Sequence, residues 1–514
     1  MALLFDSLAL DLLTIFTVVL AVLYLYLVRN FDFWKKSGIP FVPPVPLFGC
    51  MKEVILQKSN IGHHMKTLYD AHRGLPYVGI FTVDHPALLV RDIALVKRIL
   101  LQDAHCFLDR IIKVDETLDP LNGKAIFALT GRKWKYVRAS LSPAFTPGKM
   151  RRMFYLVDEC GQELVRYLDV HASDGRPVQV NETMARFTTD VIASCAFGIE
   201  SNSLKNPDSE FRHFLCRLCK LSVVRAFASL TTYFAPALQS VLRLRIMDDD
   251  VLNFFRNTVW STVEYREKNN VERRDFLDNM MELRKRGKDQ ETSFSIDGDD
   301  FVAQAFAFLL AGFETASTTL SHTLYELALH PEIQSRLRNE ISQVMATHKN
   351  ELTYDVIQDI TYLDMVMSET LRKYPVVTSL ERKCLNDYNL PCALGKGNVV
   401  LRANTDVFIP VYALHHDPEF FPEPEKFDPE RFTEGNKRER PTFCYLPFGE
   451  GPRNCIGIRF GQLQVKTGLI HILSHYNVEP CTDTPVSLVF DPKVFHLKTV
   501  EEIPLAFRRI EQTQ

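Results

Sequence analysis

The sequence predicts a mainly α-helical protein with smaller β-sheets, an α+β fold with one large domain behind an N-terminal apolar helix. Helical periodicity dominates from about residue 134 to residue 345. From Pro375 onward, short apolar runs alternate with Pro, Asp and Gly, which is typical of short strands joined by loops. After residue 50 no stretch rich in Pro, Gly and Ser marks a domain boundary, so we expect a single folding unit.

Composition narrows the class of protein. The 514 residues are 46% hydrophobic, which is enough for a large buried core. The net charge of -3 gives no reason to expect a nucleic acid as a partner. The 11 cysteines are odd in number and irregularly spaced, which favours reduced thiols in the cytosol over the disulfide framework of a secreted protein.

The N-terminus contains an apolar segment without charges, from Leu12 to Val28. As a helix it would be about 26 Å long, just enough to cross a bilayer. Arg29, Lys35 and Lys36 follow it, so the positive-inside rule places the rest of the chain in the cytosol. A cleaved signal peptide is the alternative, but the basic residues lie on the wrong side and no Ala-x-Ala site follows. The segment is therefore predicted to be an uncleaved anchor.

The chain then divides into three parts. Residues 1–30 form the predicted anchor, residues 31–50 a Pro-rich connector, and residues 51–514 the large domain. The connector contains "GIPFVPPVPLFG", whose prolines favour an extended, stiff segment. Such a segment would fix how the domain sits over a membrane.

The stretch "PFGEGPRNCIG", Pro447 to Gly457, is the strongest candidate for a functional site. One hypothesis is a dinucleotide-binding turn, because Gly449-x-Gly451 lies between a strand-like and a helix-like run. That pattern fails in detail. Asn454 stands where the third glycine belongs, and no series of β-α-β units surrounds the loop.

The other hypothesis makes Cys455 a metal ligand. A thiolate is stabilised by backbone N–H groups at a helix N-terminus and by positive charge, which Arg453 would supply. The glycines, including Gly449, would let the backbone approach a large flat group against which Phe448 packs. Zinc would need three further ligands and the loop offers none. A single thiolate beside a planar partner indicates haem iron.

The pattern Phe-x-x-Gly-x-Arg-x-Cys-x-Gly, ending at Gly457, resembles the haem-binding loop of the cytochrome P450 family. The resemblance implies the cytochrome P450 fold, with residues 51–514 as a haem-thiolate catalytic domain. It also implies haem b as cofactor, with Cys455 as the axial ligand of the iron. Arg453, Phe448 and Gly449 would contribute to cofactor binding.

Two further motifs extend the resemblance. The first is a set of three charged residues. "SETLRKYP" supplies Glu369 and Arg372, and "FDPERF" supplies Arg431, which together resemble the family's buried structural network. Alone, such an i,i+3 pair is usually an exposed salt bridge. Three buried charges are tolerated only as a satisfied network, so truncation of one should be severe. We therefore expect these residues to support the cysteine loop.

A second motif lies in the apolar run Phe301 to Leu320, which reads as a buried helix. Its "AGFET" resembles the family's oxygen-binding groove, which implies that Thr315 hydrogen-bonds to bound dioxygen and that Glu314 relays protons. Gly312 costs a helix about 1 kcal/mol relative to Ala, so its presence needs a reason. Ala316 stands where the family often has a hydroxyl residue, which places more of the relay on Glu314 and water.

Residues elsewhere resemble the family's hydrogen-bond donors to the haem propionates. Trp134 and Arg138 in "GRKWKYVR" lie four residues apart on one helix face, and Arg382 follows "YPVVTSLE". The alternative is that these side chains lie on a solvent-exposed face of the protein and bind no propionate. By position in the family, the predicted substrate contacts are Phe127, Phe308, Ala311, Val377 and Phe495. Each of these five could equally be ordinary core.

The sequence around "FLDR" and "LSPAFTPGKM" is most similar to that of the insect microsomal, xenobiotic-metabolising branch of the family. This implies a monooxygenase of the endoplasmic reticulum membrane that inserts one atom of O2 into apolar small molecules such as plant toxins or insecticides. The chain shows no convincing nucleotide or flavin fingerprint, so electrons would come from NADPH through NADPH-cytochrome P450 reductase, with cytochrome b5 as an optional donor. Oxidation of an endogenous lipid or hormone, a haem-thiolate isomerase or dehydratase, and a non-catalytic haem sensor remain alternatives.

A run of basic residues is predicted to form the face that meets the acidic reductase. Its members are Arg132, Lys133, Lys135, Arg138, Arg453, Arg459 and Lys466.

Overall fold

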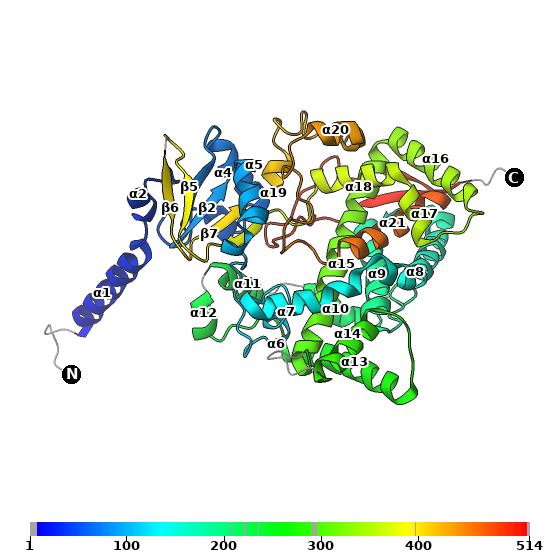
Figure 1. The fold of residues 1–514 in the computed structure, drawn as a ribbon, viewed down its shortest axis with the longest axis horizontal. Helices are drawn as coiled ribbons and strands as arrows, with labels where there is room; N and C mark the ends of the chain where they lie inside the picture. Colours follow the sequence, from blue (N-terminus) through cyan, green and yellow to red (C-terminus); the bar gives the residue numbers. More distant parts are fainter. Residues whose placement is uncertain are drawn as a thin grey trace.

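The computed structural model describes residues 8–206, 208–219, 223–234, 236–289, 296–395 and 397–510. A sheet-rich part lies beside α1 and α2, and a larger helical part is arranged around the long helix α15 (Figure 1). The prediction of a mainly helical fold with smaller sheets is confirmed. The strand-to-loop character expected after Pro375 is correct for β4 to β9, although α19, α20 and α21 interrupt it.

The first helices are α1 (Leu8–Val28), α2 (Phe33–Ser37), α3 (Lys52–Ile55), α4 (Ile61–Ala71), α5 (Ile93–Lys97), α6 (Pro120–Gly123), α7 (Gly131–Leu141), α8 (Pro147–Asp174), α9 (Val180–Ile192) and α10 (Glu210–Cys219). The next are α11 (Val223–Phe234), α12 (Pro236–Val241), α13 (Asp249–Asn269), α14 (Phe276–Asp289), α15 (Gly298–Leu329) and α16 (Pro331–Thr347). The last are α17 (Tyr354–Asp359), α18 (Thr361–Lys373), α19 (Val411–His415), α20 (Glu434–Glu439) and α21 (Ile458–His475). Short turns of other helix types are η1 (Arg98–Gln102), η2 (Ala104–Cys106), η3 (Ser142–Phe145), η4 (Ala193–Phe197) and η5 (Pro429–Phe432).

The strands of the described residues form three small sheets. They are β1 (Tyr77–Thr82), β2 (His85–Val90), β3 (Val178–Gln179), β4 (Leu380–Lys383), β5 (Tyr388–Pro391), β6 (Asn398–Leu401), β7 (Asp406–Ile409), β8 (Tyr476–Pro480) and β9 (Pro504–Arg509). The sheet orders are β1-β2-β7-β4, β3-β9-β8 and β5-β6. β2 and β7 run parallel, and the other neighbours in the first sheet are antiparallel. This sheet places β4, and thus Arg382, beside the helical part.

Helix α15 forms the centre of the helical part because nearly all of its side chains are apolar or hydrogen-bonded inward. Its residues are buried for most of its length, and α9, α18 and α21 pack against it. Gly312 is needed for this packing, since a Cβ there would lie 2.7 Å from Ile192 Cδ1 of α9. Gly312 is thus explained by a close helix–helix contact, in addition to the oxygen-binding groove that the family resemblance implies.

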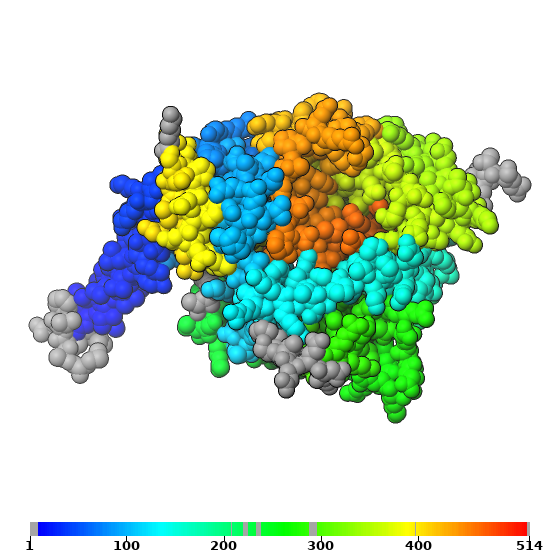
Figure 2. Space-filling model, in the orientation of Figure 1, coloured from blue at the N-terminus to red at the C-terminus, as the bar shows by residue number. Residues whose placement is uncertain are grey.

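Helix α1 differs from the rest because its apolar side chains face outward. It stands clear of the body (Figure 2), and residues such as Leu13 and Leu25 are about 60% exposed. Among the described residues, Ala9–Ser37 and Gly298–Leu329 are long and apolar enough to cross a membrane, but α15 is a core helix. The N-terminal helix is therefore the candidate anchor.

Candidate active site

The cysteine loop lies between α20 and α21. The Cys455 N–H donates to Phe448 O at 2.9 Å, which closes the loop just before the helix. Gly449 and Gly451 adopt φ of 68° and 75°, conformations that favour glycine. A Cβ on Gly451 would lie 1.8 Å from Leu100 O of η1. This glycine therefore lets the loop approach another backbone segment, which the sequence alone did not indicate.

The Cys455 side chain is exposed. The surrounding protein raises the pKa of its thiol, whereas the Gly457 N–H and the charges of Arg138 and Arg110 act in the opposite direction. The expectation that Arg453 supplies the charge at the thiolate is corrected. Arg138 and Arg110 do so, because the Arg453 guanidinium is turned elsewhere.

Arg453 lies buried against Trp134 of α7. Its guanidinium carbon is 3.9 Å from the centroid of the indole, and Nε and Nη2 donate to Leu108 O and Leu129 O at 2.9 and 2.7 Å. A contact to Asp109 at 3.4 Å completes its surroundings. Arg453 and Trp134 thus tie the cysteine loop to α7 and to the segment before it.

Arg138, one turn after Trp134, reaches the same loop. Its two terminal nitrogens donate to Asn454 O at 2.9 Å and to Asn454 Oδ1 at 2.6 Å. Asn454, which counted against a dinucleotide-binding turn, therefore has a structural function. It fixes Arg138 next to Cys455.

Three arginines gather beside this loop from segments far apart in the sequence: Arg110, Arg382 of β4 and Arg453. Burial and the charge of Arg110 lower the pKa of Arg382 to about 9, although Glu381 opposes this. Burial, with the charges of Arg110 and Arg382, likewise lowers the pKa of Arg453 to about 9, although Asp109 opposes this. Such mutual repulsion suits a site that receives an anionic group.

Arg110 was not identified as a functional residue from the sequence. The segment "FLDR" contributed to the family resemblance, but no spacing connected its arginine to the cysteine. In the structure its guanidinium carbon lies 3.8 Å from the ring centroid of Phe127, and its charge acts on Cys455, Arg382 and Arg453.

Helix α15 carries the predicted oxygen-binding residues. Ala311 and Thr315 are exposed, one helical turn apart, and the Thr315 hydroxyl donates to Ala311 O at 2.5 Å. Gln464 of α21 is buried and its Nε2 donates to Gly312 O at 3.0 Å. The helix that follows Cys455 is thereby bonded to the segment that carries Thr315.

Glu314 is held by two residues near the C-terminus. Its Oε1 lies 2.7 Å from Lys498 Nζ and 3.3 Å from His496 Nε2. Burial alone would raise the pKa of Glu314, but these two groups outweigh it and lower the pKa to about 2. Glu314 is therefore a carboxylate at neutral pH. Neither partner was found from the sequence, since they lie more than 180 positions away.

The predicted network of Glu369, Arg372 and Arg431 is assembled as expected. Arg372 Nε and Nη2 donate to the two Glu369 oxygens at 2.7 and 2.9 Å, and both side chains are fully buried. Arg431 Nε lies 3.4 Å from Glu369 Oε1, which also accepts the Asp428 N–H at 2.9 Å.

The network reaches the cysteine loop through α19. Arg372 donates to His415 O at 3.1 Å, and His415 Nε2 accepts the N–H of Leu446 at 2.8 Å. Leu446 lies directly before the loop. Burial and the charge of Arg372 lower the pKa of His415 to about 3, which keeps the imidazole neutral and able to accept.

The predicted substrate contacts fall into two groups. Phe127 and Val377 are 44% and 47% exposed although apolar, and Ala311 is exposed beside Thr315. Phe308, in contrast, is buried, with its ring centroid 4.1 Å from that of Phe276 and 5.0 Å from that of Phe145. The expectation of substrate contact at Phe308 is therefore corrected, because α14 and η3 cover this face of α15.

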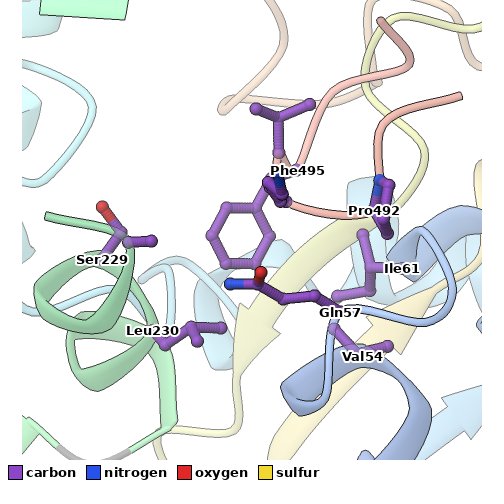
Figure 3. A pocket seen from close by; sticks show the side chains of 10 residues that line it. Val54, Gln57, Ile61, Ser229, Leu230, Pro492 and Phe495 are labelled. Atoms are coloured by element: carbon purple, nitrogen blue, oxygen red, sulfur yellow. The ribbon is translucent and has the colours of Figure 1, made fainter. Parts of the chain in front are cut away.

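Phe495 lines a small pocket between the sheet-rich part and α11. Its ring points toward Ser229 and Leu230 of α11 and toward Gln57, next to Val54 of α3 (Figure 3). No residue of the cysteine loop or of Gly312–Thr315 lines this pocket. Phe495 thus lies on the outer side of the C-terminal segment.

The predicted basic face also needs correction. Lys466 is buried and pairs with Asp364 at 2.7 Å, and Arg453 is buried as described. Lys133 pairs with Asp300 at 3.0 Å. Arg132, Lys135 and Arg459 remain exposed.

The residues present fit haem. The Cys455 thiol is exposed at the start of α21, and the arginines beside it repel one another in a way that the two propionates would relieve. Phe127, which packs against Arg110, and Val377 are apolar yet exposed, as expected of side chains that a bound apolar group or substrate would cover. Fold and site together define a haem-thiolate protein.

Comparison with known proteins agrees with this assignment to the haem-thiolate proteins. A profile of the cytochrome P450 family matches residues 39–503. The chain is 52% identical over 493 residues to cytochrome P450 6j1 of Blattella germanica, covering 96% of each chain. It is 41% identical over 497 residues to cytochrome P450 6a2 of Drosophila melanogaster, covering 95% of this chain and 97% of that one. This chain belongs to the cytochrome P450 family. It is a monooxygenase with haem as cofactor, and the relatives named above are insect cytochromes P450.

Proposed function

We propose that this monooxygenase oxidises apolar xenobiotics, such as plant toxins or insecticides, with electrons from NADPH delivered by NADPH-cytochrome P450 reductase. The observation that carries the proposal is the Glu314–Thr315 pair on α15, bonded through Gly312 and Gln464 to the helix that follows Cys455. A haem-thiolate isomerase or dehydratase would have little use for this pair. The exposed apolar side chains of Val377 and Phe127 suit an apolar substrate.

Each residue has a task in this scheme. Haem bound through Cys455 supplies O2 activation and oxygen transfer. Arg110, Arg138 and Arg382 would hold its propionates. Thr315 must give up its hydrogen bond to Ala311 O in order to donate to a ligand. Glu314 would relay protons from solvent toward Thr315.

The first test is the carbon-monoxide difference spectrum of the dithionite-reduced protein. We expect the strongly red-shifted Soret band of thiolate ligation, and its loss in Cys455→His. Cys481→Ser is the matched control, because the Cys481 thiol donates to a backbone carbonyl, as a hydroxyl can. A band that persists in Cys455→His would refute the assignment of the ligand.

The second test is turnover. With reductase present, NADPH consumption should rise when an apolar probe such as 7-ethoxycoumarin is added, and a hydroxylated or dealkylated product should form. Oxidation of probe without NADPH consumption, or binding with no turnover of any apolar probe, would refute the proposal. Faster turnover of endogenous lipids or hormones than of plant toxins and insecticides would favour the endogenous alternative.

The third test concerns the reductase. Because Lys466 and Arg453 are buried, the charge reversals that address docking are Arg132→Glu and Lys135→Glu. Each should slow reduction at low salt, whereas Arg402→Glu, at an exposed site after β6, should not. Unchanged reduction rates would exclude this face of α7. Addition of cytochrome b5 to the same assay decides whether it serves as a second donor.

We also propose that α1 anchors the protein in the endoplasmic reticulum membrane as a single pass, with the catalytic domain in the cytosol. The outward-facing apolar side chains of α1 and the basic residues after it support this. Removal of residues 1–30 should shift the protein from the membrane fraction toward the soluble fraction. An unchanged distribution would refute the anchor.

A further inference from the structure

Glu314 lies against a segment that has its own fold. Residues 489–500 form a narrow hairpin, in which the Asp491 N–H donates to Lys498 O at 2.8 Å and the Val500 N–H to Val489 O at 2.9 Å. From this hairpin, His496 Nε2 and Lys498 Nζ approach the same Glu314 oxygen. We call this pair of residues the Glu314 clamp.

The hairpin is attached to the segment after α18. The Leu497 N–H donates to Val376 O at 3.1 Å, and Val377 and His496 form an antiparallel bridge. Val377 is an exposed candidate substrate contact, and Phe495, which precedes His496, lines the pocket against α11. Any ligand that displaces Val377 or Phe495 therefore acts on backbone that carries the clamp.

The clamp is only partly shielded from solvent. The exposed fractions of the side chains of Glu314, His496 and Lys498 are 21%, 26% and 42%. An ion pair with access to water can separate without leaving a bare charge in the core, unlike a fully buried pair. The contacts are thus suited to opening.

Other charges lie behind the clamp. The charge of Lys498 lowers the pKa of Glu502, although burial and Glu182 leave it raised overall. Glu502 accepts the Glu182 N–H at 3.2 Å, and Glu182 pairs with Arg212 of α10 at 2.8 Å. A path of charged groups therefore runs from Glu314 through Lys498, Glu502 and Glu182 to Arg212 of α10.

We propose that His496 and Lys498 are positioning residues that hold Glu314 away from proton delivery until substrate against Val377 shifts the hairpin. This rests on the proposed monooxygenase function. While the clamp is closed, the carboxylate accepts from Lys498 and stays ionised. When the hairpin moves, Glu314 is released, takes a proton from solvent and passes it toward Thr315. The clamp thereby links proton use to occupancy by substrate.

The test compares the wild-type holoenzyme with Lys498→Met and with Lys498→Arg, which keeps a cation. Lys437→Met, on exposed α20, controls for loss of a surface charge. NADPH consumed without 7-ethoxycoumarin, and product formed per NADPH with it, are measured at neutral pH in the presence of reductase. Hydrogen exchange of the peptide 494–500 is measured with and without the probe, which needs no turnover.

In the wild type the probe should raise exchange in 494–500. In Lys498→Met exchange should be high without the probe. More NADPH should also be consumed without the probe, because Glu314 has lost its lysine and can relay protons before substrate binds. Lys498→Arg and Lys437→Met should behave as wild type.

Wild-type NADPH consumption in Lys498→Met without the probe would overturn the positioning role, even if exchange rises. Exchange that does not respond to probe in the wild type would overturn the link to substrate. Failure of the wild type to consume NADPH with any probe would count against the monooxygenase proposal instead, and the exchange measurements would still decide on the clamp.

Discussion

Two carboxylates of this protein are each held by two basic side chains, but in opposite ways. Glu369 and Arg372 are fully buried and joined by two parallel hydrogen bonds, with Arg431 at 3.4 Å. Glu314 is partly exposed and meets Lys498 and His496 through one oxygen. The first pair comes from one helical turn, the second from segments far apart in the sequence.

The difference shows how one kind of interaction serves either rigidity or movement. A guanidinium fork fixes both oxygens of Glu369 in plane, and opening it would strand charges in the core. A lysine is a flexible point charge, and water can replace it at Glu314. The pKa values differ accordingly. Burial raises that of Glu369 despite its arginines, whereas His496 and Lys498 lower that of Glu314.

The largest expected effect is at the rigid pair. Arg372→Met leaves the buried Glu369 carboxylate with one distant cation, so the free energy of unfolding should fall by about 3–5 kcal/mol. Urea unfolding followed by circular dichroism measures this. Arg402→Met, which breaks an ion pair that is largely exposed, should cost less than about 1 kcal/mol. An equal loss of unfolding free energy in both variants would contradict the view that the buried Glu369–Arg372 pair is the rigid one.

A smaller effect is expected at the movable pair. The pKa of Glu314 is about 2 in the fold, below its usual 4.5, so the ionised group stabilises the fold above pH 4.5. Glu314→Gln should therefore lower stability at pH 7 by about 1–2 kcal/mol. The difference from wild type should shrink as pH falls from 4.5 toward 2. Thermal unfolding at pH 7 and pH 4 tests this, and a constant difference would contradict the shifted pKa.

The smallest effect concerns substrate affinity. Val377 is exposed at the hairpin, whereas Phe308 packs under α14. Val377→Ala should weaken binding of 7-ethoxycoumarin about fivefold, as expected for loss of about 1 kcal/mol of apolar contact. Phe308→Leu should cost stability and leave the dissociation constant unchanged. Titration of the substrate-induced spectral shift measures both, and a larger effect at Phe308 would reverse the assignment.

The contacts of a motif could be predicted from the sequence where the contacting residues lie close together in the chain. Glu369 and Arg372 lie three residues apart on one helix, so their contact followed from helix geometry. The functions of Gly451 and Arg453 were only half predicted. Their types mark the cysteine loop, but their partners, Leu100 O and the Trp134 ring, come from other parts of the chain. Lys466 illustrates the same limit, because its buried side chain pairs with the half-exposed Asp364 of α18.

The sequence by itself determined the fold class, the family and haem as cofactor, and it predicted Cys455 as the ligand, because each depends on periodicity or on residues within about ten positions. Tertiary structure alone decided which cations act on Cys455, which aromatic side chains stay exposed for a ligand, and what holds Glu314. Arg110, His496 and Lys498 carry no local signal, since their charges act through space on groups that only the packing of α15, α21 and the C-terminal hairpin brings near.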